Sequence, residues 1–259
     1  MSKAILYDAT QCVGCLECEA ACAKQNGLPY DEEIAKVKKT SDTKFTYVAV
    51  KTNDGEEKYM RNLCMHCVDP TCVSVCPVKA LTKTAQGPVV YDASKCMGCR
   101  YCMMACPFQV PKYEWSKAIP TIKKCIMCSD RVAAGKQTAC AEACPTGSTL
   151  FGDRDLLLVE ARKRIDQNPL QYVNHIYGEK EAGGTGVMML SSVRFSEFGL
   201  PMNLGTESLP SITGGVLSHV PDVVTLGSAV LGGIYWITHR REVVALAEHE
   251  SNVEEEDHE

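Results

Sequence analysis

The 259-residue sequence contains sixteen cysteines, which gather in four short groups. Most neighbouring cysteines within a group are separated by two to four residues, which disfavours a framework of disulfide bonds between neighbours. Regularly spaced thiols of this kind are typical metal ligands. The groups are Cys12, Cys15, Cys18 and Cys22; Cys64, Cys67, Cys72 and Cys76; Cys96, Cys99, Cys102 and Cys106; and Cys125, Cys128, Cys140 and Cys144.

The spacing of these thiols favours iron–sulfur clusters. Cysteines at i, i+3 and i+6 can wrap a loop around one [4Fe–4S] cluster, and a fourth cysteine before a proline ligates a neighbouring cluster. Pro77, Pro107 and Pro145 follow the last cysteine of three groups, whereas Ala23 takes this place in the first group. The alternative is a structural zinc protein, but zinc knuckles need neither the third closely spaced cysteine nor the terminal Cys-Pro.

An internal repeat organises the four groups. Residues 7–22, "YDATQCVGCLECEAAC", match residues 91–106, "YDASKCMGCRYCMMAC", at all four cysteines and at several positions around them. The second and third groups are joined by a segment that predicts two short strands around a Gly-Pro turn, and they form an inner module over 60–114. The first and fourth groups then pair around it as an outer module, 1–30 plus 115–150. The fold class predicted for 1–150 is therefore α+β, with two nested bacterial-type dicluster ferredoxin modules.

This nesting predicts four [4Fe–4S] clusters and a ligand set for each of them. Because the last cysteine of each group crosses to the partner cluster, all sixteen thiols are used and no open site is left for substrate chemistry. Folding of 1–150 should then depend on the clusters. We expect Cys12, Cys15 and Cys18 with Cys144; Cys125, Cys128 and Cys140 with Cys22; Cys64, Cys67 and Cys72 with Cys106; and Cys96, Cys99 and Cys102 with Cys76.

Other segments must position these loops. Residues 40–60 predict a hairpin insertion with its turn at Asn53-Asp54-Gly55. Within 151–211 we expect a brace helix, "RDLLLVEARKRIDQ", capped by Asp153 and stopped at Asn168-Pro169, and then an extended segment. The "GGTG" run at 183–186 lacks the frame of a nucleotide site, so a Gly-rich turn before the strand "VMML" is the better interpretation.

The segment 212–239 predicts one transmembrane helix. Val223 to Thr238 contains no charged residue, and about twenty apolar residues cross a bilayer. The alternative is a buried core helix, but several glycines and the Tyr235-Trp236 pair favour a helix in lipid. His219 could serve a haem or quinone pocket, or it could be an ordinary surface histidine. We expect the acidic tail, 240–259, to be solvated and disordered at its end.

The composition of the chain argues against a nucleic acid partner. The net charge is −5 and aromatic residues make up 7% of the chain, so no nucleic acid partner is expected.

No Lys or Arg occurs from Phe195 to Asp222, whereas Arg240 and Arg241 follow the span directly. Positive residues mark the cytoplasmic end of a span, which predicts a periplasmic cluster domain and a cytoplasmic C-terminus. We expect no secretory leader in "MSKAILYDATQC", and hence export alongside a partner that carries the signal.

The cysteine groups, together with "QNGLP", "CMHCVDPTCVSVCPVKAL", "CRYCMMACPFQVPKY" and "YGEKEAGGTGVMML", resemble the iron–sulfur beta subunits of membrane-bound respiratory oxidoreductases. The resemblance covers nearly the whole chain and includes the formate dehydrogenase N and hydrogenase-2 types. It implies an electron relay between a catalytic subunit and a membrane cytochrome b or quinone-reactive subunit. The expected absence of a secretory leader favours the formate dehydrogenase arrangement, in which the catalytic partner carries the leader. The sequence around the second and third cysteine groups favours the hydrogenase type, so both types of catalytic partner remain open. A polyferredoxin-like subunit of another molybdopterin oxidoreductase is the alternative.

Overall fold

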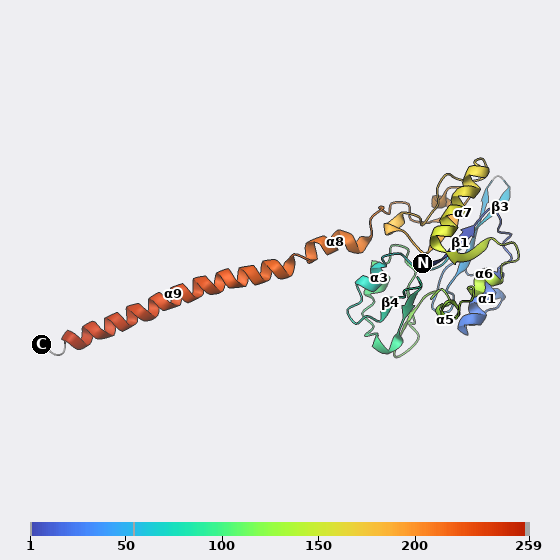
Figure 1. Cartoon of the computed structure of the whole chain (residues 1–259). Helices are drawn as coiled ribbons and strands as arrows, with labels where there is room; N and C mark the ends of the chain where they lie inside the picture. The colour runs from blue at the N-terminus through green and yellow to red at the C-terminus, as the bar shows by residue number, and fades with distance from the viewer. Residues whose placement is uncertain (1, 54, 257–259) are drawn as a thin grey trace. The chain divides into compact units, whose positions relative to one another are not determined.

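The structure is a computed structural model that describes residues 2–53 and 55–256. The chain divides into a cysteine-containing unit, Met1–Pro210, and a helical unit, Ser211–Glu259. The strands are β1 (Lys3–Asp8), β2 (Tyr47–Asn53), β3 (Glu56–Asn62), β4 (Leu81–Lys83), β5 (Val89–Tyr91), β6 (Lys112–Tyr113), β7 (Ile122–Lys123), β8 (Thr149–Asp153) and β9 (Val187–Leu190). The α-helices are α1 (Glu17–Asn26), α2 (Glu32–Lys36), α3 (Thr71–Ser74), α4 (Tyr101–Ala105), α5 (Ser129–Ala133), α6 (Ala139–Glu142), α7 (Arg154–Gln167), α8 (Leu209–Leu217) and α9 (Val220–Glu256), as drawn in Figure 1.

A three-stranded sheet, in the order β8-β1-β9, forms the centre of the cysteine-containing unit. Strand β1 pairs antiparallel with β8, where Ile5 lies opposite Phe151, and parallel with β9, where Ile5 lies opposite Val187. The central strand carries the unbroken apolar run "AILY", all of it buried. Such a run is typical of a strand that is covered on both faces.

The two faces of β1 pack against different parts of the unit. Because side chains alternate along a strand, Ile5 and Tyr7 point into one core cluster, which also contacts Cys12, Cys18, Cys67, Cys125 and Cys140. Ala4 and Leu6 point into a second cluster, which α7 supplies with Leu157, Ala161 and Ile165. The sheet therefore separates the cysteine loops from the helix that braces them.

Helix α7 occupies the residues predicted for the brace helix and ends at the predicted stop. Figure 1 shows it lying alongside β1. The predicted side-chain cap is wrong: the carboxylate of Asp153 makes no capping hydrogen bond and instead pairs with Lys3 Nζ at 2.8 Å. This carboxylate therefore links β1 to β8. At the other end of α7, Arg164 Nη1 lies 2.8 Å from Asp8 Oδ2 and ties the helix to β1.

The predicted hairpin is present as β2 and β3, which pair over their full length with Val48 opposite Arg61. Its turn includes Asp54, which lies outside the described residues. The two short strands expected between the second and third cysteine groups are β4 and β5. The strand expected after the Gly-rich turn is β9, and Gly183 and Gly184 before it both adopt positive φ angles, 81° and 89°.

Short helices bring distant cysteine groups together. Helix α1 carries Cys18 and Cys22 and packs against α6, which carries Cys140. Helix α3, with Cys72, packs against α4, with Cys102. The first and fourth groups are thus neighbours, as are the second and third.

The helical unit contains the one stretch of the described chain that is long and apolar enough to cross a membrane, Leu209–Leu246, with a mean hydropathy of 1.4 and no burial inside the protein. Instead of one helix over 212–239, the structure has α8 and α9 with a break around Ser218 and His219. The disorder expected for the tail is wrong as far as Glu256, because α9 continues to that residue; 257–259 lie outside the described residues. Ala, Leu and Glu favour a helix there, and Gly and Pro are missing from the segment after the span.

Candidate iron–sulfur sites

All sixteen cysteines are free thiols. Cys22, Cys64, Cys102 and Cys140 are buried, Cys15 is exposed, and the others are partly buried. Regularly spaced thiols that come together in the fold are typical metal ligands. The arrangement therefore agrees with a metal-binding function for all four groups.

Each cysteine group begins with the same sharp turn. The second residue after the first cysteine is in the left-handed region in every case: Gly14 (φ 69°), His66 (φ 47°), Gly98 (φ 74°) and Met127 (φ 52°). Such a turn coils the loop and aims backbone N–H groups inward. Gly98 N and Met127 N each donate a hydrogen bond to the first cysteine of their loop, Cys96 Sγ and Cys125 Sγ, at 3.4 Å. N–H groups aimed at sulfur are what a cluster ligand requires.

The sequence repeat is also a structural repeat. Leu16 and Arg100, at equivalent positions, have nearly the same left-handed φ angles, 62° and 63°. Each is directly followed by a helix, α1 or α4, that carries the next cysteine inward. The duplicated sequence thus builds the same loop-then-helix unit twice.

Thiols of the second and third groups lie near one another. The electrostatic neighbours of Cys67 and Cys72 include Cys64 of their own group and Cys106 of the third group, and those of Cys72 also include Cys102. Those of Cys102 are Cys96 and Cys99 of its own group and Cys76 of the second group. The last cysteine of each group therefore has neighbours in the other group.

Thiols of the first and fourth groups also lie near one another. The thiol of Cys22 has Cys140 and Cys128 among its electrostatic neighbours, and Cys125 has Cys22, Cys140 and also Cys64 of the second group. Cys18 has both Cys12 and Cys140 as neighbours. All four ligand sets remain predictions.

Burial controls the acidity of these thiols. It raises the pKa of Cys18 and Cys102 to about 11 and that of Cys22 and Cys72 to about 12, with neighbouring thiolates adding to the effect. These side chains are therefore protonated at neutral pH until a metal supplies positive charge. Cys144 is the opposite case: burial alone would raise its pKa, but backbone N–H groups around Thr146 and Thr149 bring it below the usual value.

In the part of the chain that the structure describes, no three His, Cys, Asp or Glu side chains form a group that could hold a metal ion. Four thiolates on one zinc must all lie about 2.3 Å from it, whereas in a cubane each cysteine binds a different iron. The preference for clusters over structural zinc therefore rests on the spacing of the cysteines along the sequence.

Buried basic side chains next to the cysteines were not expected from the sequence. Lys124 is 3% exposed and donates from Nζ to the carbonyls of Cys125, at 3.0 Å, and Val89. Lys83 donates from Nζ to the carbonyls of Cys67 and His66, at 2.6 and 3.1 Å. Both lie near Cys72. Only the position of Lys124 directly before Cys125 could have suggested such a role.

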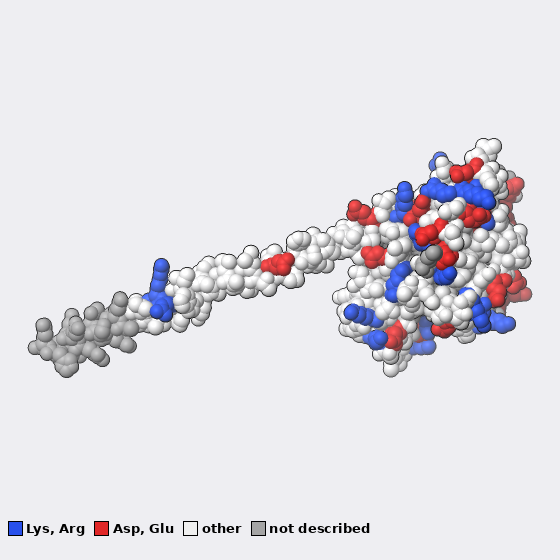
Figure 2. All heavy atoms as spheres, in the orientation of Figure 1, with Lys and Arg blue, Asp and Glu red and all other residues white. Residues whose placement is uncertain are grey.

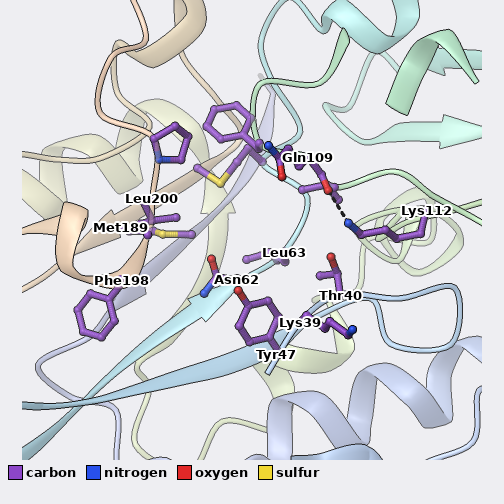
Figure 3. A pocket seen from close by; sticks show the side chains of 15 residues that line it. Lys39, Thr40, Tyr47, Asn62, Leu63, Gln109, Lys112, Met189, Phe198 and Leu200 are labelled. Carbon is purple, nitrogen blue, oxygen red and sulfur yellow. Dashed lines mark hydrogen bonds between the residues drawn. The ribbon is translucent and has the colours of Figure 1, made fainter. Parts of the chain in front are cut away.

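One cavity, of about 240 Å³, lies between the hairpin, the loop after Cys106 and the segment around Leu200 (Figure 3). Its basic side chains are Lys39 and Lys112, and Lys112 Nζ donates to Gln109 O at 2.9 Å. The described residues that line it include no carboxylate, imidazole or thiol.

Loops with a left-handed residue after the first cysteine, and thiols of different groups that lie near one another, are typical of an iron–sulfur protein. Comparisons with known proteins agree. The family described as "4Fe-4S dicluster domain" matches residues 56–154. A protein of Nitratidesulfovibrio vulgaris is 44% identical over 95% of this chain and 70% of its own length. Hydrogenase-2 operon protein HybA of Escherichia coli O157:H7 is 37% identical, over 77% of this chain and 73% of HybA.

A formate dehydrogenase iron-sulfur subunit of Haemophilus influenzae is 30% identical, over 90% of this chain and 79% of that subunit. The chain belongs to the family that HybA and these formate dehydrogenase iron–sulfur subunits represent. It is an iron–sulfur electron-transfer protein of the hydrogenase or formate dehydrogenase type, and the resemblance inferred from its motifs is confirmed.

Proposed function

We propose that the chain relays electrons through four [4Fe–4S] clusters, between a catalytic subunit of hydrogenase or formate dehydrogenase type and a membrane cytochrome b or quinone-reactive subunit. The observation that best supports the proposal is the proximity of thiols from different groups. Cys106 of the third group is an electrostatic neighbour of Cys67 and Cys72, and Cys76 of the second group is an electrostatic neighbour of Cys102. Such proximity is expected if the last cysteine of each group ligates the partner cluster, as in two-cluster ferredoxins.

The proposed modules are nested over 1–150. The inner module covers 60–114, and the outer module covers 1–30 plus 115–150. The packing of α1 on α6 and of α3 on α4 supports this division. The proposed ligand sets are Cys12, Cys15, Cys18 and Cys144; Cys125, Cys128, Cys140 and Cys22; Cys64, Cys67, Cys72 and Cys106; and Cys96, Cys99, Cys102 and Cys76. When bound, the clusters would supply one-electron redox chemistry, while the chain holds them and shields them from solvent.

The proposed location is the membrane, with the span in 212–239 and the cluster domain on the periplasmic side. The exposed apolar stretch Leu209–Leu246 supports a membrane anchor. In Figure 2 the helical segment is almost free of charge until Lys and Arg side chains appear close to the grey residues. Arg240 and Arg241 are those side chains, and basic residues favour the cytoplasmic end.

Metal analysis of the protein purified without oxygen tests the cluster proposal. Four clusters give roughly sixteen iron and sixteen sulfide per chain, and dithionite reduction gives low-temperature electron paramagnetic resonance (EPR) signals. A zinc-loaded chain without acid-labile sulfide would overturn it. Half the expected iron in a fully folded chain would reduce the relay to two clusters.

Affinity purification from the native membrane tests the partners. We expect a catalytic subunit and a cytochrome b or quinone-reactive subunit to elute with the tagged chain in detergent. The proteins encoded beside it would name the catalytic partner. A different molybdopterin enzyme in the eluate would support the alternative, a polyferredoxin-like subunit of another molybdopterin oxidoreductase.

A further inference from the structure

Arg61, on the hairpin strand β3, is buried inside the protein. Its side chain is 1% exposed, lower than almost any other charged residue of the unit. The guanidinium donates from Nε to Thr46 Oγ1 at 3.0 Å. Its Nη1 atom is fully buried and has no hydrogen-bond partner in the described part of the chain. A buried donor without a partner is costly. Thr46 Oγ1 and the thiol of Cys140 serve other parts of the guanidinium, so Nη1 needs an acceptor that the described residues do not provide.

The charge of Arg61 also lacks a carboxylate. Among the described residues it makes no ion pair, and the buried carboxylate of Glu19 is already held by Lys44 Nζ at 2.7 Å. Removing an uncompensated charge from water costs several kcal/mol or more. A cation in this position is therefore stable only beside negative charge of another origin.

The electrostatic neighbours of the guanidinium are cysteines. They are Cys140, which is also a hydrogen-bond partner, Cys18 and Cys22, and Arg61 acts on Cys128 as well. An arginine is not deprotonated in proteins, so the side chain is a fixed cation. Its neighbours belong to both ligand sets proposed for the outer module.

We propose that Arg61 is an electrostatic tuning residue that raises the reduction potentials of the two outer clusters, one from each of these ligand sets. Each reduction adds one negative charge. A fixed cation in a buried site of low dielectric stabilises that charge more than it would in water. The unpaired Nη1–H is placed to donate to a cluster or to a ligand sulfur. This inference rests on the proposed ligand sets.

The test is a redox titration of the full chain, reduced stepwise with dithionite and followed by EPR. Arg61→Gln removes the charge and keeps a hydrogen-bonding side chain of similar length. We expect the ratio of reduced to oxidised outer cluster at a fixed potential to fall at least tenfold, which is a downward shift of about 59 mV for a one-electron couple. The inner clusters should keep their potentials. Cys18→Ser and Cys140→Ser identify the outer components.

Arg162→Gln is the matched control. Arg162 lies on α7 and is half-exposed, and the substitution removes one positive charge from its ion pair with Glu179. All potentials should stay unchanged in it. If Arg61→Gln does not assemble clusters, Arg61→Lys is tested instead. Clusters with nearly native potentials in Arg61→Lys would support the proposed role of the positive charge. If Arg61→Lys also fails to assemble clusters, Arg61 is a packing residue and the inference is overturned. An assembled Arg61→Gln with unchanged outer potentials also overturns it. A wild-type chain without four clusters would instead refute the proposed function.

Discussion

At the scale of single residues, the cysteines define the candidate site. Thiols from different groups become neighbours because α3 packs on α4 and α1 on α6. Each of the four loops has a left-handed residue after its first cysteine, and two of these residues are not glycine, His66 and Met127. Those residues accept backbone strain of about 1–3 kcal/mol each, which is typical of positions that hold a ligand.

The crossing of cysteines between groups can be tested residue by residue. We expect Cys106→Ser to alter the same EPR component as Cys64→Ser, because both thiols belong to one proposed ligand set. Cys76→Ser and Cys96→Ser should together alter a different component. If Cys106→Ser and Cys96→Ser changed one component in common, the proposed crossing would be wrong.

The buried cations belong to the part of the site that sequence reasoning missed. Cysteine spacing predicts ligands well because the loop that wraps a cluster is local in sequence. Arg61 lies on a strand with several charged residues, "EEKYMRN", and nothing in that pattern singles it out as the buried one. Its burial results from the docking of the hairpin onto loops far away in sequence.

At the scale of elements, the hairpin covers the first cysteine loop. A Cβ atom on Gly14 would lie 2.3 Å from the ring of Tyr59 on β3, and the φ angle of Gly14 is 69°. Gly14→Ala should therefore push the hairpin away and lower the iron content of the chain by roughly one cluster. Iron and sulfide per chain measure this loss.

Gly27→Ala is the control for that substitution. Gly27 has a similar φ of 62° at the end of α1, but a Cβ there would meet nothing within 4 Å. Gly27→Ala should therefore lower the stability only by the backbone strain, about 1–2 kcal/mol, and the variant should keep its iron. In the double variant Gly14→Ala with Tyr59→Ala, the iron should return. If it does not, backbone strain and not the hairpin contact is the cause.

Local patterns predicted the elements better than they predicted the sheet. The hairpin strands, β4, β5, β9 and the whole of α7 follow from alternation, Gly-rich turns and helical periodicity within short windows. The pairing of β1 with β8 and β9 joins segments on opposite sides of all four cysteine groups, and no local signal carries it. The α8–α9 break was missed because apolar composition alone does not locate the end of one helix and the start of the next.

At the scale of the whole molecule, the clusters should be needed for folding. Burial raises the pKa of Cys22 and Cys72 to about 12, so an iron-free chain would have to bury protonated thiols around empty space. We expect a chelator with a mild oxidant to unfold 1–150 cooperatively. Far-UV circular dichroism and limited proteolysis follow the change, with iron-saturated chelator as control. Native-like spectra in fully iron-free protein would argue against it.

Membrane orientation is a second property of the whole chain. Because Arg240 and Arg241 follow the span and no Lys or Arg occurs from Phe195 to Asp222, we expect the cluster domain outside the cytoplasm and the C-terminus inside. Protease added to intact spheroplasts should digest the cluster domain and spare a tag fused after Glu259. The opposite pattern would place the relay on the cytoplasmic face. The double variant Arg240→Glu with Arg241→Glu should weaken the preference for a cytoplasmic C-terminus.

The central position of β1 has a consequence for biosynthesis. Among the three strands of this sheet, β1 leaves the ribosome first, and both of its partners, β8 and β9, are made only after all sixteen cysteines have been translated. At 5–20 residues per second, the apolar strand waits roughly 10–40 s for β9. During that interval its unpaired edges are exposed to other nascent chains. A chaperone that holds the N-terminal segment, and the delivery of iron and sulfide only after chain release, would protect the protein through this delay.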